Sequence, residues 1–360
     1  MCDNDRIMKH PILRRALLAV CLLLALSLSC QVFSTEQPVL ETPPAPDTSP
    51  LPTVAPPVEA PPGEAGPEEP SPTIPPESAA TQVQPEQPAK IDSGACKKDA
   101  CIRRGSFLLE RPIGPDGRNT IVVASRFGEY QQATKDAQTG VYFLNSTGTP
   151  VLAAADGKVV VAGDDSVTPY GPMLGMYGNL VILEHSLPEL TRPLYTLYGH
   201  LSEVSVGEGD PVTVGQTIGL VGSSGGAGGS TLLFEVRLGK NNPDQVRNPE
   251  LWLKPLKGDK DKELGAIAGR ILAADGEFLH ITHIVVEQLA GPGMPAIDQF
   301  YLQTYSATRL RGLSPWEESF AIGDLPAGDY QISFMLEDII RQQVVTVRPG
   351  KLTLATITVE

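Results

Sequence analysis

Residues 148–160 read GTPVLAAADGKVV, and residues 177–185 read YGNLVILEH. YGHLS follows at residues 198–202, and VTVGQTIG follows at residues 212–219. These stretches join short β-branched and aliphatic runs to Gly, Pro and Asp, which are the residues that favour turns between strands. No long amphipathic helical pattern interrupts them. The sequence therefore predicts an antiparallel all-β domain.

The individual strands of this domain are expected at the short apolar runs that turn residues separate. These runs are Asn119–Ala124, Val151–Ala154, Lys158–Ala162, Asn179–Glu184, Leu194–Leu197, Thr217–Val221 and Leu232–Leu238. A second series of β-type runs follows the charged segment KPLKGDKDK at residues 254–262, so two β-rich domains are expected.

Proline and charge are unevenly distributed along the chain. Of the 34 Pro among 360 residues, 17 fall between Gln31 and Pro88, where no periodic apolar pattern could bury enough surface to offset chain entropy. We expect residues 30–90 to be a disordered Pro-rich tether that favours polyproline II. The formal net charge is −14, from 28 Lys and Arg against 42 Asp and Glu. This balance argues against nucleic acid as a partner, because nucleic-acid modules present a basic patch.

Residues 1–29 have the pattern of an export signal. Basic residues at positions 9, 14 and 15 precede Ala16–Ser29, an uncharged apolar run with the length of a secretory core and too short to span a bilayer comfortably. SLSC at residues 27–30 resembles a bacterial lipobox, which would make Cys30 a lipidated residue, and ordinary cleavage is the alternative. The protein is expected at the outer face of the cell membrane as a lipoprotein with a lipid anchor in that membrane, or secreted.

Cys96 and Cys101 form a close pair in GACKKDACIRR. In an oxidising compartment such a pair predicts a small disulfide-closed loop. A zinc ribbon needs two such pairs, and no further Cys follows in the sequence.

The stretches at residues 148–160, 177–185, 198–202 and 212–219 occur in an order and at a spacing that resemble the LytM/lysostaphin-type zinc metallopeptidases, which cut peptide cross-links in bacterial peptidoglycan. The resemblance covers Phe107 to Leu256. It implies an antiparallel sheet domain of the duplicated-hybrid-motif kind, which we assign to residues 91–256.

Active members of that family bind zinc through the His and Asp of His-x-Gly-x-Asp and the second His of His-x-His. The resemblance places Gln138 and Tyr142 at the first two ligand positions in QTGVYF, Leu233 at the third in STLLFEV, and Thr231 at the auxiliary catalytic histidine. Only His200 remains of the five working side chains. Leu has no lone pair, and Gln and neutral Tyr are poor zinc ligands. No metal and no other cofactor are therefore expected.

His200 is interpreted first as a retained structural histidine and second as a contact in a ligand cleft. That cleft would have Tyr142, His200 and Thr231 at its floor and the Gly-rich loop at residues 222–230 as its rim. His185 has no expected metal role. His280 and His283 (HITH) lie in a predicted strand, Phe278–Val286, where residues three apart point to opposite faces, so they are expected at the surface.

Residues 265–360, after a linker at residues 257–264, resemble the carboxypeptidase-regulatory-like β-sandwich modules, which have an Ig/transthyretin-like fold. The resemblance depends on AGRI at residues 268–271, IGDLPAGDY at residues 322–330 and VTVRPG at residues 345–350. It implies a spacer, adhesion or partner-binding module without chemistry of its own.

Three functions remain open from the sequence. The first is a non-catalytic LytM-fold protein of the cell envelope that binds peptidoglycan peptides or regulates a cell-wall hydrolase. The second is an active zinc endopeptidase with non-standard ligands, for which zinc would be the cofactor. The third is a purely structural surface lipoprotein.

Overall fold

The computed structural model describes residues 96, 99–131, 135–291, 294–307, 310 and 316–360. All described residues lie in one compact unit, Gln82–Glu360. The expected export signal, Cys30 and the Pro-rich tether lie outside the described residues. In the part that is described, no helix has the length and apolar character needed to cross a membrane.

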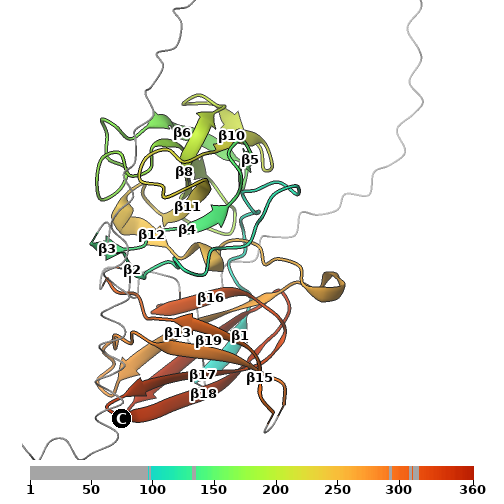
Figure 1. The fold of residues 1–360 in the computed structure, drawn as a ribbon, viewed down its shortest axis with the longest axis vertical. Helices are drawn as coiled ribbons and strands as arrows, with labels where there is room; N and C mark the ends of the chain where they lie inside the picture. Colours follow the sequence, from blue (N-terminus) through green and yellow to red (C-terminus); the bar gives the residue numbers. More distant parts are fainter. Residues whose placement is uncertain (1–95, 97–98, 132–134, 292–293, 308–309, 311–315) are drawn as a thin grey trace, which may run out of the picture. The chain divides into compact units, whose positions relative to one another are not determined.

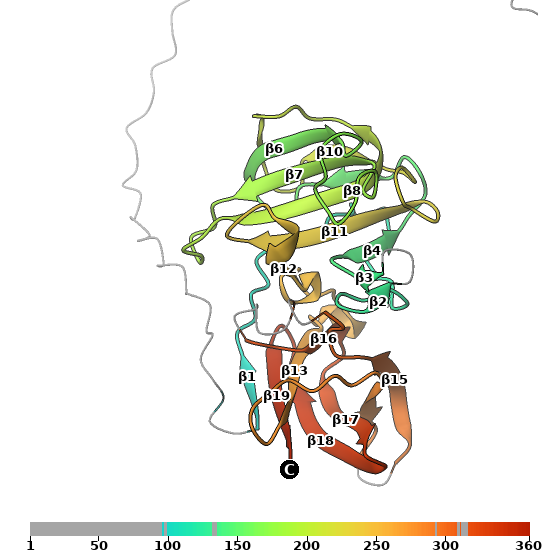
Figure 2. The same cartoon turned by 90° about the vertical axis from the view of Figure 1, so that its left-hand side faces the viewer.

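The regular elements of the described residues are strands and short 3-10 helices, which confirms the predicted all-β class. One nine-stranded sheet contains the order β12-β11-β8-β7-β6-β9, with β4 beside β11 and with β10 beside β5 and β8 (Figures 1 and 2). Its strands are β4 (Val141–Leu144), β5 (Pro150–Leu152), β6 (Gly157–Asp164), β7 (Asn179–His185), β8 (Leu194–Val204), β9 (Pro211–Val212), β10 (Thr217–Val221), β11 (Thr231–Leu238) and β12 (Val246–Arg247).

Both faces of this sheet are packed, which explains why its central strands are near-continuous apolar runs. In β11, Leu232 and Phe234 join one buried cluster, whereas Leu233 between them joins another with Tyr177 and Leu197. Successive residues of a strand point to opposite faces, so a strand covered on both sides has no polar alternation. The second of these clusters lies on the face that carries the candidate site.

Two predicted strands are wrong in position. Asn119–Ala124 forms no strand, because the Asn119 side chain bonds both backbone groups of Ile113 and thereby closes a turn. Only Val122 N reaches a strand, donating to Tyr142 O at 3.0 Å. The strand predicted at Phe278–Val286 begins only at Ile284, in β14.

The remaining strands form two four-stranded sheets and one two-stranded hairpin. The sheets have the orders β1-β19-β13-β16 and β15-β14-β17-β18, and side chains from both enclose one buried cluster. The strands are β1 (Ala100–Arg103), β13 (Gly265–Ala273), β14 (Ile284–Leu289), β15 (Ala296–Leu302), β16 (Phe320–Leu325), β17 (Gly328–Leu336), β18 (Ile339–Val347) and β19 (Leu352–Val359). The hairpin consists of β2 (Tyr130–Gln131) and β3 (Asp136–Ala137).

Strand β1 lies within the segment assigned by sequence to the first domain, residues 91–256, yet it pairs antiparallel with β19 near the C-terminus. Cys96 and Cys101 form a disulfide, and Cys101 itself lies opposite Leu354 in this pairing. The disulfide loop therefore adjoins the sheet that contains β13, β16 and β19.

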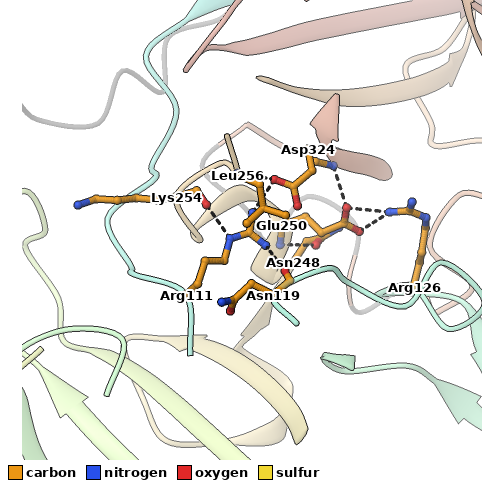
Figure 3. A network of polar contacts seen from close by, with 9 residues as sticks. Arg111, Asn119, Arg126, Asn248, Glu250, Lys254, Leu256 and Asp324 are labelled. Carbon is orange, nitrogen blue, oxygen red and sulfur yellow. Dashed lines mark hydrogen bonds and ion pairs between the residues drawn. The ribbon is translucent and has the colours of Figure 1, made fainter. Parts of the chain in front are cut away.

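Residues that precede and follow the nine-stranded sheet in the chain contact β16 through a largely buried polar network (Figure 3). Glu250, in the 3-10 helix Pro249–Leu251 (η3), accepts from Arg126 Nη1 and from the backbone N of Gly323. Asp324 Oδ1 accepts from Arg111 Nη2 at 2.6 Å and from Leu256 N at 2.9 Å. These bonds join the two sheet systems through charged groups that are largely excluded from water.

The expected linker at residues 257–264 has ordered backbone. It contains the 3-10 helix Asp259–Asp261 (η4), and Gly258 N donates to Lys262 O at 2.8 Å. Further along the chain, His280 and His283 are both exposed. His280 Nδ1 lies 3.2 Å from Thr304 Oγ1, and His283 Nδ1 lies 2.9 Å from Thr282 Oγ1.

Candidate functional site

The residues predicted for the site converge through the pairing of β4, β8 and β11. Leu233 lies opposite Tyr142 of β4 on one side and opposite Gly199 of β8 on the other. His200 is the residue after Gly199 and therefore lies next to the position opposite Leu233. The His200 ring is stacked with the Tyr142 ring, with centroids 6.0 Å apart and an interplanar angle of 3°. Strands far apart in sequence thus bring these side chains to one place.

Leu233 is completely buried. It packs in an apolar cluster with Tyr177, Leu180, Ile182 and Leu197. At this position the side chain supplies van der Waals contact and has no donor atom for a metal.

Gln138 is also buried, and its backbone is held by the residues of the preceding turn. Its N–H donates to Glu129 O at 2.7 Å, and its carbonyl accepts from Gly128 N at 2.8 Å. Its side-chain Nε2 is buried and has no hydrogen-bond partner among the described residues. The Gln138 amide is neutral: its Nε2 is a donor without a lone pair, and its oxygen is an uncharged and therefore poor ligand for zinc.

Tyr142 and His200 are neutral polar groups at physiological pH. Burial raises the pKa of the Tyr142 phenol, against the opposing effect of the nearby Gln138 side chain. Burial lowers the pKa of the His200 imidazole, and its hydrogen bond to Ser224 acts in the opposite direction. His200 Nδ1 lies 2.9 Å from Ser224 O, and because a carbonyl only accepts, Nδ1 carries the proton. His200 thus ties β8 to the Gly-rich loop.

This set of side chains does not fit a zinc ion. A catalytic zinc needs three protein ligands from His, Cys, Asp or Glu. At the three assigned positions stand an amide, a protonated phenol and an aliphatic chain. Across the part of the chain that is described, no three His, Cys, Asp or Glu side chains are grouped closely enough to hold a metal.

Next to the site lies a buried charged network that the sequence reasoning missed. Glu235 Oε1 accepts from Thr139 Oγ1 at 2.5 Å and from the Tyr177 hydroxyl at 2.6 Å, while Oε2 accepts from Arg237 Nη2 at 2.7 Å. Burial raises the pKa of Tyr177 well above its usual value. The signal was present in FEVRL, because Glu235 and Arg237 are two residues apart and therefore share a strand face.

In this network both oxygens of the Glu235 carboxylate are engaged. Arg237 Nη1 further donates to Asn241 Oδ1 at 2.9 Å, and its Nη2 donates to Tyr170 O at 2.8 Å. A buried charge pair with all of its groups bonded orders the surrounding loops and offers no free group for chemistry.

A cleft of about 290 Å³ opens over Tyr142. Its lining is uncharged and consists of Val122, Ser125, Gln131, Tyr142, Leu144, Gly226, Ala227, Gly228, Gly229, Ser230 and Thr231. The predicted floor residues Tyr142 and Thr231 and the predicted Gly-rich rim thus line one cavity. His200 is not part of the lining, because it is 2% exposed and faces Ser224.

The rim is fixed by backbone contacts with the loop before β7. Gly226 N donates to Met176 O at 2.9 Å. Gly225 has φ +68°, and a Cβ on it would lie 2.3 Å from Gly178 N, so only Gly permits this approach. The Gly-rich loop is therefore positioned by close backbone packing.

The other predicted histidine, His185, is completely buried away from this cleft. Its Nε2 lies 2.7 Å from Thr196 Oγ1 and its Nδ1 lies 2.8 Å from Asp156 O, and burial lowers its pKa.

An antiparallel sheet with a Gly-rimmed cleft over β4 and β11 describes the class of domain, and comparison with known proteins gives the family of that domain. Residues 136–245 match the model of Peptidase family M23. The chain therefore carries an M23 domain of the LytM/lysostaphin type, and the predicted resemblance is confirmed to this extent.

Relatives of this domain include a protein named as a hydrolase activator and a protein named as an endopeptidase. The chain is 37% identical over 128 residues to the murein hydrolase activator EnvC of Escherichia coli, an alignment that covers 36% of this chain and 26% of EnvC. It is 36% identical over 97 residues to the peptidoglycan DD-endopeptidase ShyA of Vibrio cholerae, covering 27% of this chain and 19% of ShyA. The alignments span about a quarter of the length of the curated relatives.

Among solved structures, the catalytic domain of lysostaphin from Staphylococcus simulans matches at 29% identity. The match covers 34% of this chain and 85% of that chain, with a TM-score of 0.30.

Proposed function

We propose that this protein is a non-catalytic LytM-fold protein of the bacterial cell envelope that binds peptidoglycan peptides or regulates a cell-wall hydrolase. The observation that carries the proposal is the chemistry at the three ligand positions, where Gln138, Tyr142 and Leu233 stand. A zinc ion would activate water and polarise the scissile carbonyl. His200 as a positioned base would supply only about 10²–10⁴-fold.

The named relatives support a cell-wall context and leave two roles to choose between. EnvC is named a murein hydrolase activator, and ShyA is named a peptidoglycan DD-endopeptidase. An endopeptidase of the zinc kind needs ligands that the assigned positions lack, so the site favours the regulatory or binding role for this chain.

The cleft over Tyr142 is the proposed place for a peptide. Its lining offers the Tyr142 phenol and the Ser and Thr hydroxyls as hydrogen-bonding groups, and the Gly-rich rim leaves room for a peptide backbone. Because none of the lining side chains is charged, burial of an uncharged peptide there carries no cost of desolvating a charge.

Binding is tested by sedimenting the purified protein with peptidoglycan and by titrating it with soluble peptides released from peptidoglycan. Tyr142→Phe should weaken peptide binding about two- to tenfold, because one hydrogen bond contributes about 0.5–1.5 kcal/mol. Tyr195→Phe is a matched control, since its hydroxyl donates to Glu184 Oε2 and is not part of the lining. Equal affinities of wild type and Tyr142→Phe would move the binding site elsewhere.

Regulation and the competing functions need two further measurements. Adding the protein to a purified cell-wall hydrolase should change the rate of peptidoglycan release if the regulatory role is correct. Stoichiometric zinc in the purified protein, with release of peptides by the protein alone, would establish the endopeptidase alternative. No binding and no effect on a hydrolase would leave the purely structural surface lipoprotein.

The proposed position is the outer face of the cell membrane as a lipoprotein, or outside the cell. In the lipoprotein version, Cys30→Ala should release the protein from the membrane fraction while the folded part stays intact. Membrane fractionation of that variant, with wild type as reference, tests the anchor. Retention of the variant in membranes would exclude Cys30 as the anchoring residue.

A further inference from the structure

The cleft over Tyr142, here called the proximal compartment, adjoins a second hollow. This distal compartment, of about 430 Å³, is lined by Asp116, Gly117, Arg118, Leu144, Asn145, Ser146, Thr149 and Ser230. Leu144 and Ser230 line both compartments, so the two adjoin at the end of β4 and are together called the groove here. The proximal lining has no charged side chain, whereas the distal lining has two.

The backbone of Arg118 is held in place by the end of β4. Arg118 N donates to Asn145 Oδ1 at 2.7 Å, and Asn145 Nδ2 donates to Arg118 O at 3.0 Å. One side-chain amide thus satisfies both backbone groups of Arg118. The Asn119 side chain likewise bonds both backbone groups of Ile113: Ile113 N donates to Asn119 Oδ1 at 3.2 Å, and Asn119 Nδ2 donates to Ile113 O at 2.6 Å. Side-chain amides therefore hold this turn at Ile113 and at Arg118.

Gly117 is required for this arrangement. A Cβ at this position would lie 2.4 Å from Ile113 Cγ2 and 3.0 Å from Asn145 Oδ1. The close approach therefore depends on the missing side chain, and it brings Arg118 beside the groove with its backbone already fixed.

The side chains that this turn presents are exposed charges. Among the described residues, no hydrogen bond or ion pair engages the guanidinium of Arg118 or the carboxylate of Asp116, and both residues are exposed. A guanidinium presents a planar fork of N–H groups that matches a carboxylate with two parallel hydrogen bonds. Asp116 in the same compartment repels every anion, and it repels a multiply charged one such as phosphate more strongly than a single carboxylate.

The groove therefore combines an uncharged section with a charged end. We propose that the distal compartment binds the carboxylate end of a peptide whose uncharged part lies in the proximal compartment, with Arg118 as the recognising group. This inference rests on the proposed function. It adds the orientation of the bound peptide and the residue that recognises its carboxylate end. A charged terminus in the proximal compartment would lose its hydration without gaining an opposite charge.

The test titrates the whole protein with soluble peptides released from peptidoglycan, and with the same peptides after their carboxyl groups are converted to amides. Wild type should bind the acid form about fivefold more tightly at low salt, because an exposed ion pair contributes up to about 1 kcal/mol. Arg118→Gln should bind both forms alike, and Arg118→Lys should keep part of the preference. Arg348→Gln removes the same charge from an exposed position outside the groove and should behave as wild type.

Two results would overturn the inference while leaving the proposed function standing: equal binding of acid and amide forms by wild type, or an unchanged preference in Arg118→Gln. A third result, displacement of the peptide by acetate at equal concentration, would also overturn the inference, since the compartment would then be a site for small anions. If wild type binds neither form, the proposed peptide binding fails and the inference fails with it. Circular dichroism of each variant checks that the fold is retained.

Discussion

Glu250 and Arg126 form an ion pair in which both side chains are buried. Arg126 Nη1 donates to both carboxylate oxygens of Glu250, at 2.8 and 2.7 Å, and the side chains are 8% and 2% exposed for Arg126 and Glu250. Glu250 Oε2 also accepts from the backbone N of Gly323 in β16, at 2.8 Å. One carboxylate thus joins η3, the loop before β2 and the C-terminal sheet (Figure 3).

Glu250→Ala should lower the free energy of unfolding by about 3–5 kcal/mol, because it leaves the Arg126 charge buried without its partner. Urea denaturation followed by tryptophan fluorescence measures the change. Glu110→Ala is the matched control, since Glu110 pairs with Lys254 where both side chains are about half exposed, and it should cost under about 1 kcal/mol. Similar losses for the two variants would contradict the structural role of the buried pair.

Glu318 should make stability depend on pH. Burial raises the pKa of its carboxyl to about 7, with hydrogen bonds from its own backbone and from the Tyr305 hydroxyl and the charge of Arg247 acting in the opposite direction. The folded-state pKa exceeds the unfolded value near 4.5, so this contribution to stability is complete below pH 4.5 and is lost as pH rises to about 7. The loss amounts to about 3 kcal/mol.

The measurement is the difference in unfolding free energy between Glu318→Gln and wild type at several pH values. The variant has no titrating group at this position, so its stability relative to wild type should rise between pH 4.5 and 7 and then level off. The other carboxyl groups act on both proteins alike and cancel in the difference. A difference that stays constant with pH would show that Glu318 titrates normally.

Removal of metal should not affect the fold. The assigned ligand positions contribute packing through Leu233 and neutral polar groups through Gln138 and Tyr142, so EDTA should leave the Tm unchanged. Differential scanning calorimetry with and without chelator tests this. A Tm that falls by several degrees and recovers on addition of zinc would contradict the non-catalytic proposal.

Restoring the ligand types should create a zinc site. The triple variant Gln138→His, Tyr142→Asp and Leu233→His would supply two imidazoles and a carboxylate on the paired strands β4 and β11 and the turn before β4, which is a ligand set that zinc accepts. Metal analysis should give one zinc per chain, and zinc at about 100 times its dissociation constant should stabilise the variant by about 2.7 kcal/mol.

The double variant Gln138→His and Tyr142→Asp, which keeps Leu233, is the control and should bind zinc far more weakly because it has only two ligands. A folded triple variant without zinc affinity would show that these positions are wrongly assigned.

The sequence alone determined the features that depend on local pattern. The bounds predicted for Thr217–Val221 are those of β10, because β-branched and aliphatic residues bounded by turn residues are typical of a strand. The resemblance at residues 138–143 and 230–236 also predicted which side chains stand at the zinc-ligand positions. Residue type decides whether a side chain can bind a metal, so the sequence alone predicts poor zinc ligands at those positions.

Tertiary structure decided the features in which distant segments meet. Asn119–Ala124 has the composition of a strand, yet a side-chain amide closes a turn there, and β1 pairs with β19 across more than two hundred residues of chain. His200 fits a cleft floor by sequence, but its bond to Ser224 turns it away from the cavity. The lining of the distal compartment includes Arg118, which Asn145 holds by a hydrogen bond to its backbone, and Gly117, whose missing side chain permits that approach. Strand register and close packing between remote residues govern all of these, and no local pattern encodes them.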